Sequence, residues 1–269
     1  MAHHTNEYVD INGHRTWLHR SGVGDEIVLL LHGGMSCSDD ILGALEGPLA
    51  LSHEVVAFDR KGHGFTADTD EPFHYESMAD EVIGVVERLG RPVHVVGWSD
   101  GGIAALLASR RRPDLVLRQV LIGTNFHHDG IVLTHVEEGA EIGELGGELG
   151  AQMAESYGRR SPDGPDHFPV VFAKFVTMAR TEPTLTPEDL GAIGTPTLVL
   201  AGDDDMVSLA HTVALYEALP AAQLAVVPGA SHAVPLEKPT LVGQLILDFI
   251  RGPIPPLTAL PIRRAVAAS

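Results

Sequence analysis

The sequence predicts an α/β fold with a mostly parallel central sheet and helices on both faces. Short apolar runs alternate along the chain with longer runs of helical spacing, and this alternation is typical of parallel strands connected by helices. One apolar run, residues 93–98, leads through Ser99 into a glycine- and alanine-rich helical run. The length of 269 residues suits one domain of this class that carries an insertion.

The first half of the chain predicts a hairpin followed by alternating strands and helices. Asn12-Gly13 lies between two strand-like runs, and this dipeptide is the strongest short hairpin signal. Residues 26–31 form a continuous apolar run, as expected of a strand that is buried on both faces. The elements predicted here are strands over 7–12, 14–19, 26–31 and 53–58, and helices over 42–51 and 75–89.

The second half resumes the alternation after an interruption. Between residues 125 and 185, acidic residues, glycines and helical runs replace the strand–helix pattern, so this segment is predicted to be an insertion. The other elements predicted here are strands over 93–98, 115–123, 196–201 and 223–227, and helices from Ser99 to Arg112-Pro113, over 209–219 and over 240–250. The predicted organisation is a core over 1–124 and 186–252, a helical insertion over 125–185, and a C-terminal tail over 253–269.

The composition argues against several classes of binding partner and indicates a cellular compartment. A formal net charge of −18 argues against nucleic acid and weakens the case for an anionic membrane surface. No apolar run is long enough to span a membrane, and the N-terminal residues lack the order of a signal peptide. The single cysteine, Cys37, excludes an internal disulfide and fits a reducing compartment. We therefore expect a cytoplasmic protein, whose oligomeric state the composition does not indicate.

The turn at Ser99 has the pattern Gly-x-Ser-x-Gly. Small neighbours such as Gly97 and Gly101 allow a strand and a helix to approach closely around a strained serine. The helix that follows directs its N-terminus at the serine, where backbone N–H groups and the helix dipole stabilise negative charge. The pattern therefore indicates a nucleophile at Ser99.

A nucleophilic serine needs a base and a group that orients the base. Carboxylates follow the strand predicted over 196–201, at Asp203, Asp204 and Asp205, and His232 follows the strand predicted over 223–227. Active sites of open α/β sheets gather at such strand ends. These residues are the candidates for the acid and the base, and three carboxylates compete for the role of the acid.

These motifs, in this order, resemble those of the α/β-hydrolase superfamily over nearly the whole chain. The resemblance implies an α/β-hydrolase fold with Ser99 as nucleophile, His232 as base and Asp205 as acid, because the family places the acid three residues after the turn glycine. It also implies that the insertion is a cap over the pocket. The motifs that carry the resemblance are His32-Gly33-Gly34, the turn over residues 59–64, the serine turn, Gly202-Asp203-Asp204-Asp205 and Gly229-Ala230-Ser231-His232. The serine turn itself resembles the biphenyl-hydrolase-like, valacyclovir-hydrolase branch.

The oxyanion hole and the substrate contacts are predicted around the same turn. One donor is expected to be the backbone N–H of Asp100, directly after the serine. The resemblance places the second donor at Gly34, with Met35 as the alternative. The Asp100 carboxylate, Trp98 and Met35 are predicted to contact the substrate, whereas residues 59–64 are interpreted as scaffolding.

The function predicted from these residues is hydrolysis of a small-molecule carboxylic ester through an acyl-enzyme. Amino-acid esters are one candidate class, because the resembling branch acts on them. The alternatives are a cofactor-free haloperoxidase or enol-lactonase-like hydrolase on the same triad, and a binding protein without catalysis. No metal and no cofactor are predicted, because no histidines are convincingly spaced for a metal.

The predicted cap is acidic. Residues 125–158 contain no Lys or Arg, so its field is expected to favour cationic substrates. The carboxylates in this segment are Asp129, Glu137, Glu138, Glu141, Glu144, Glu148 and Glu155.

Overall fold

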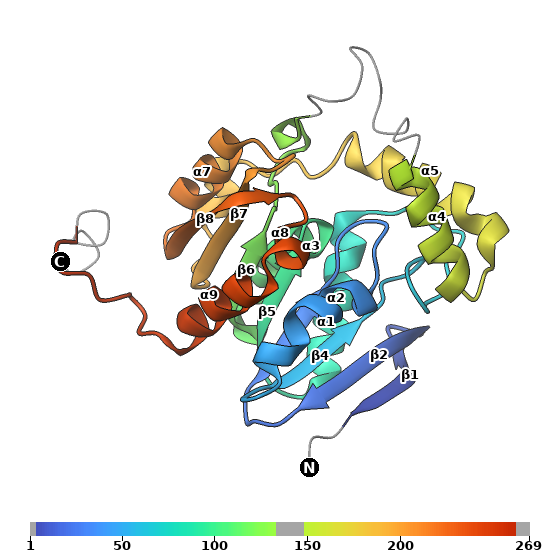
Figure 1. Ribbon diagram of the computed structural model, residues 1–269, viewed down its shortest axis with the longest axis horizontal. Coiled ribbons are helices and arrows are strands. Elements are labelled where there is room, and N and C mark those ends of the chain that lie inside the picture. The colour runs from blue at the N-terminus through green and yellow to red at the C-terminus, as the bar shows by residue number, and fades with distance from the viewer. Residues whose placement is uncertain (1–3, 133–147, 262–269) are drawn as a thin grey trace.

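An eight-stranded sheet forms the centre of the chain in the computed structural model, which describes residues 4–132 and 148–261 (Figure 1). The strand order is β1-β2-β4-β3-β5-β6-β7-β8. The strands are β1 Thr5–Ile11, β2 His14–Gly22, β3 Ile27–Leu31, β4 Glu54–Phe58, β5 Val93–Trp98, β6 Val116–Ile122, β7 Thr197–Asp204 and β8 Ala222–Ser231.

The sheet is mostly parallel. β2 pairs antiparallel with β1 and with β4, and the other neighbours pair parallel. Since parallel strands need crossover connections, helices follow the strands along the chain. The helices are α1 Ser38–Leu49, α2 Tyr75–Leu89, α3 Asp100–Arg111, α4 Glu148–Arg160, α5 Phe168–Ala179, α6 Pro187–Gly191, α7 Leu209–Ala218, α8 Val234–Glu237 and α9 Pro239–Arg251. Short 3₁₀ turns occur at Pro113–Leu115, His128–Gly130 and Pro165–His167.

Both faces of the sheet are buried, as the continuous apolar runs predict. In β3, Leu29 and Leu31 belong to a core shared with α2, α3 and α7, whereas Val28 and Leu30 belong to a second core shared with α1 and α9. Helices α1 and α9 lie together over one face of the sheet in Figure 1. This arrangement confirms the predicted fold class.

Two kinds of boundary differ from the prediction. Helix α1 begins at Ser38, whereas the prediction starts it at residue 42. The prediction misses the first turn because that turn is polar. Asp39 and Asp40 in that turn suit the positive end of the helix dipole but lack the apolar spacing used for the prediction. Strands β7 and β8 run beyond residues 201 and 227, because they pair up to Asp204 and Ser231.

Within the segment predicted as an insertion, the structure describes helices. α4 and α5 pack on each other at one end of the molecule (Figure 1), and α6 leads back to β7. Four of the acidic residues noted above, Glu137, Glu138, Glu141 and Glu144, lie outside the described residues. In the predicted tail, Leu257 and Leu260 are exposed. No helix within residues 4–132 and 148–261 is long and apolar enough to cross a membrane.

Candidate active site

Ser99 stands at a sharp turn between β5 and α3. Its backbone has a φ of 54° and a ψ of −120°, which lies outside the regions that L-residues ordinarily occupy. A Cβ atom on Gly97 would lie 2.3 Å from the carbonyl oxygen of Gly101, so the close approach of strand and helix needs glycine there. The strain holds the serine at the start of the helix, as the sequence pattern predicts.

His232 connects Ser99 to Asp205. The Nε2 atom of His232 lies 2.9 Å from the Oγ atom of Ser99, and its Nδ1 atom lies 2.7 Å from the Oδ1 atom of Asp205. The Asp205 side chain is 1% exposed and also accepts a hydrogen bond from the backbone N–H of Val207 at 3.0 Å. Because the carboxylate receives the Nδ1–H, Nε2 is the nitrogen free to accept a proton from serine.

Strand pairing places the acid beside the base. Asp204 in β7 pairs with Ser231 in β8. Asp205 directly follows Asp204, and His232 directly follows Ser231, so the two side chains leave the sheet at the same place. Asp203 instead accepts a hydrogen bond from the backbone N–H of Ala230 at 3.1 Å. Of the three neighbouring carboxylates, the structure therefore brings Asp205 to the imidazole.

Trp98 supports the loop that carries the histidine. Its indole N–H donates to the backbone oxygen of His232 at 2.9 Å, and the residue belongs to the core that includes α1 and α9 and is 9% exposed. Trp98 thus contacts the backbone of the proposed base, His232. Met35, the other predicted substrate contact, is buried after the His32-Gly33-Gly34 turn and has a φ of 52°.

A buried arginine donates hydrogen bonds to the backbone of the loop that is predicted to supply an oxyanion donor. Arg60, which is 1% exposed, donates from Nη1 to the backbone oxygen of His32 at 2.7 Å. From Nη2 it donates to the backbone oxygen of Gly33 at 3.0 Å. That second oxygen belongs to the peptide group whose N–H is that of Gly34. Arg60 therefore fixes the orientation of the peptide bond that ends in the predicted donor.

The sequence pattern predicts only a scaffolding role for Arg60 and gives no indication of this contact. The available signal is a cation two residues after the strand over 53–58, at the edge of the sheet where α/β sites collect. The rest of the turn is structural. Asp59 is buried and accepts hydrogen bonds from the backbone N–H groups of Ser38 at 2.6 Å and Phe65 at 2.8 Å, and burial raises its pKa to about 6.

The side chain of Asp100 lies beside the same loop. One carboxylate oxygen accepts the hydroxyl of Tyr75 at 2.9 Å, and the other, Oδ2, is buried without a hydrogen-bond partner among residues 4–132 and 148–261. A Cβ atom on Gly34 would lie 2.5 Å from Oδ2 and 2.6 Å from the ring of Phe175 in α5. Burial raises the pKa of Asp100, although the charge of Arg60 and the Tyr75 hydrogen bond oppose this rise.

The chain is similar to known proteins over most of its length. The family model described as "Alpha/beta hydrolase family" matches residues 28–245. The human (Homo sapiens) serine hydrolase BPHL is 24% identical over 261 residues, which cover 92% of this chain and 87% of the human protein.

Two solved structures are similar in fold. A variant of the meta-cleavage product hydrolase CumD has a TM-score of 0.74 at 23% identity, covering 91% of this chain and 97% of that one. The carboxylesterase CesB from Bacillus subtilis has a TM-score of 0.70 at 22% identity, covering 93% and 92%.

Proposed function

The chain is a serine hydrolase of the alpha/beta hydrolase family, and on this premise we propose that it cleaves small-molecule carboxylic esters through an acyl-enzyme at Ser99. The observation that supports the proposal is the unbroken contact from Ser99 Oγ through His232 to the buried Asp205 carboxylate. This arrangement supplies a nucleophile, a base and a group that orients the base.

In the proposed reaction, His232 accepts the proton of Ser99 while the serine oxygen attacks the ester carbonyl. Asp205 holds the ring in place and stabilises the imidazolium that forms. The backbone N–H groups of Asp100 and Gly34 stabilise the oxyanion. His232 then protonates the leaving alcohol, and in the second half of the reaction it activates the water that releases the acid.

The test of this function is covalent labelling together with turnover. A fluorophosphonate should modify one serine, identified by peptide mass as Ser99, and p-nitrophenyl acetate should be hydrolysed with a burst of p-nitrophenol. A binding protein without catalysis would give neither result. Labelling without ester turnover would favour the haloperoxidase or enol-lactonase alternative, which uses the same three residues.

Arg60 has a positioning role in this proposal. In a trans peptide, the C=O and N–H groups point in opposite directions. Because Arg60 donates to the Gly33 oxygen, the N–H of Gly34 is directed away from the guanidinium. The guanidinium also polarises this peptide, which strengthens its N–H as a donor.

Arg60→Lys is expected to lower kcat by roughly 10- to 100-fold with little change in KM. The loss stays below the 100- to 1,000-fold cost of removing one oxyanion donor, because lysine keeps the charge but cannot hold two carbonyls in a fork. The affinity of a boronic acid, which forms a tetrahedral anion on serine, should fall in parallel with kcat.

Arg118→Lys is the matched control for this experiment. Arg118 on β6 also donates to two backbone oxygens, those of Phe249 and Gly252, which lie at the end of α9 rather than at the oxyanion loop. If Arg118→Lys weakens boronic acid binding as much as Arg60→Lys does, the effect is a general loss of packing. In that event the positioning role is wrong.

Amino-acid esters are the substrate class that we propose, and the carboxylate of Asp100 supports it. Its Oδ2 atom is buried beside Gly34, at the loop that receives the scissile carbonyl in the proposed reaction, and has no hydrogen-bond partner in the described part of the chain. A buried carboxylate oxygen without a donor is costly, and an ammonium group of the substrate would supply one. The other oxygen accepts the hydroxyl of Tyr75, so the scaffold holds Asp100 while Oδ2 keeps its capacity to accept a hydrogen bond.

Asp100→Asn is expected to remove a preference for α-amino esters over their neutral isosteres, measured as the ratio of kcat/KM. Since burial raises the pKa of Asp100, the wild-type preference should vanish as the pH falls, at a pH above the ordinary aspartate value of about 4. The ratio removes effects of pH that are common to both substrates.

The control is Asp129→Asn, which removes an exposed carboxylate of the insertion. Attraction by the diffuse field of the cap would be screened over about 10 Å at 0.1 M salt. A preference that is lost in high salt and survives in Asp100→Asn would assign recognition to the acidic cap. Equal kcat/KM values for the two wild-type substrates would refute the proposed substrate class.

A further inference from the structure

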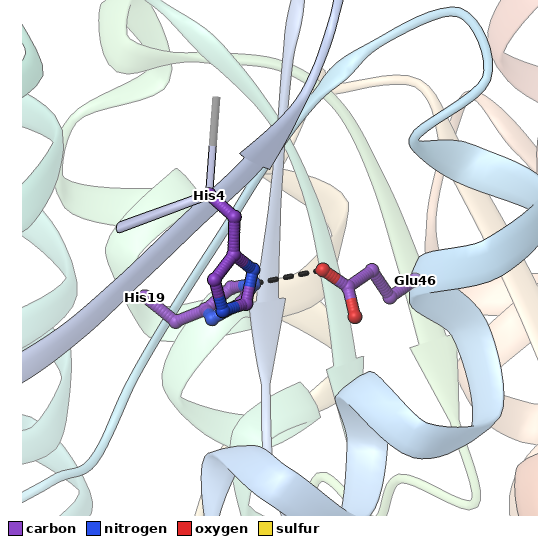
Figure 2. A group of neighbouring side chains, drawn as sticks. All are labelled: His4, His19 and Glu46. Atoms are coloured by element: carbon purple, nitrogen blue, oxygen red, sulfur yellow. Dashed lines mark hydrogen bonds and ion pairs between the residues drawn. The ribbon is translucent and has the colours of Figure 1, made fainter. Parts of the chain in front are cut away.

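Outside the candidate active site, two histidines and a glutamate converge at the start of the sheet. Figure 2 shows His4, at the entrance to β1, His19 on β2 and Glu46 on α1 with their polar ends together. Each side chain offers one nitrogen or oxygen atom, and these atoms all lie within 4.8 Å of one another. Since the three residues are far apart in the sequence, their spacing gives no metal motif.

The ring of His19 faces an oxygen atom on each side. Its Nδ1 atom lies 2.7 Å from the Oδ1 atom of Asn6, and its Nε2 atom lies 2.8 Å from the Oε1 atom of Glu46. A neutral imidazole carries one N–H and can donate to one oxygen only. The residue is 4% exposed, so water does not resolve the conflict. Either a second proton on the ring or a cation between Nε2 and the carboxylate resolves it.

The contact with Asn6 is what a metal-binding histidine requires. Ligand histidines usually donate the second ring N–H to an oxygen, which fixes the tautomer and directs the other nitrogen at the ion. With Nδ1–H on Asn6, the lone pair of Nε2 points at Glu46. The buried ligand is therefore oriented before any ion arrives.

We propose that His4, His19 and Glu46 form a binding site for a single divalent transition-metal ion of the zinc type, with water as the fourth ligand. Two imidazole nitrogens and a carboxylate suit Zn²⁺, Co²⁺ or Ni²⁺ rather than Ca²⁺ or Mg²⁺, which prefer oxygen atoms.

Small movements complete the site. Ligands about 2.0–2.2 Å from a tetrahedral ion stand about 3.3 Å apart, so the contact between His19 and Glu46 must widen slightly. Glu46 is partly exposed and His4 is exposed, so both can adjust around the buried ring. The bound ion would join the entrance of β1, β2 and α1.

The test is titration of the untagged, metal-free chain with Co²⁺, because an affinity tag would add histidines. Tetrahedral Co²⁺ gives intense visible absorption, and we expect saturation at one ion per chain, displacement by Zn²⁺ and a higher Tm with Zn²⁺. His19→Gln and Glu46→Gln should each lose this absorption or weaken Co²⁺ binding at least tenfold. His4→Gln should weaken it as well, and it tests the proposal even if a change at the buried His19 impairs folding.

His128→Gln is the matched control. His127, His128 and Asp129 form the other such group of neighbouring side chains in the described part of the chain, so this variant removes a histidine without touching the proposed site. Binding that survives in the His4, His19 and Glu46 variants but is lost in His128→Gln would overturn the assignment. Absence of any Co²⁺ absorption would overturn it too, and would mean that a proton on His19 or a reversed Asn6 amide satisfies the ring.

Discussion

Ser99→Ala and His232→Ala are each expected to lower the kcat of ester hydrolysis by roughly four or more orders of magnitude, because members of a triad act as a unit. In Ser99→Ala no oxygen remains at the position 2.9 Å from the imidazole, so no acyl-enzyme can form. In His232→Ala the serine keeps its proton. The measurement is steady-state turnover of p-nitrophenyl acetate, corrected for the uncatalysed reaction.

The double variant tests whether Ser99 and His232 act as a unit or contribute independently to kcat. Since either change already disables the unit, Ser99→Ala combined with His232→Ala should cost about as much as one of them alone. Thermal unfolding should remain cooperative in all three proteins. Turnover within tenfold of wild type in either single variant would remove the proposed mechanism.

Asp205→Asn is expected to lower kcat by about 10⁴-fold, because an asparagine leaves the geometry in place but favours the wrong tautomer of the histidine. Its amide can present N–H to Nδ1, and the ring then carries its proton on Nε2, facing Ser99. The nucleophile loses its base although every side chain remains near its place. The expected signature is a large loss of kcat with nearly unchanged unfolding.

Asp203→Asn serves as the paired variant, because it makes the same chemical change two residues away. Asp203 receives a backbone N–H from Ala230, a contact that an asparagine oxygen can keep, so the effect on kcat should be mild. A greater loss in Asp203→Asn than in Asp205→Asn would show that the acid has been assigned to the wrong carboxylate.

Sequence patterns predict the elements whose residues have a clear period. Residues 75–89 form α2 with the predicted bounds, because apolar side chains recur at helical spacing along its buried face. The strand over 93–98, the turn at Ser99 and the helix after it also lie where the motif predicts them. The order of the motifs predicts Ser99, His232 and Asp205 as one set of site residues. The structure places these three side chains in contact.

The remaining contacts depend on pairing across the fold, which no local pattern encodes. Arg60 reaches the loop at Gly33 only because β3 and β4 are neighbours in the sheet. His19 meets Glu46 because α1 packs near β2, and the two residues are far apart in the sequence. The first turn of α1 is polar and has no apolar side chains at helical spacing, so the hydrophobic pattern does not predict where this helix begins. Local patterns thus identify reactive groups more readily than the groups that position them.

The pairing of Asp204 with Ser231 constrains the length of the chain as well as its residues. Each residue advances a strand by about 3.3 Å and alternates between its faces, so a one-residue insertion or deletion after Gly202 would carry Asp205 away from His232. Between the pairs Gly202–Val227 and Asp204–Ser231, β7 advances two residues while β8 advances four, so the position of Asp205 depends on this fixed offset. Within this segment, natural variants and engineered libraries should therefore tolerate exchanges at exposed positions far better than changes in length.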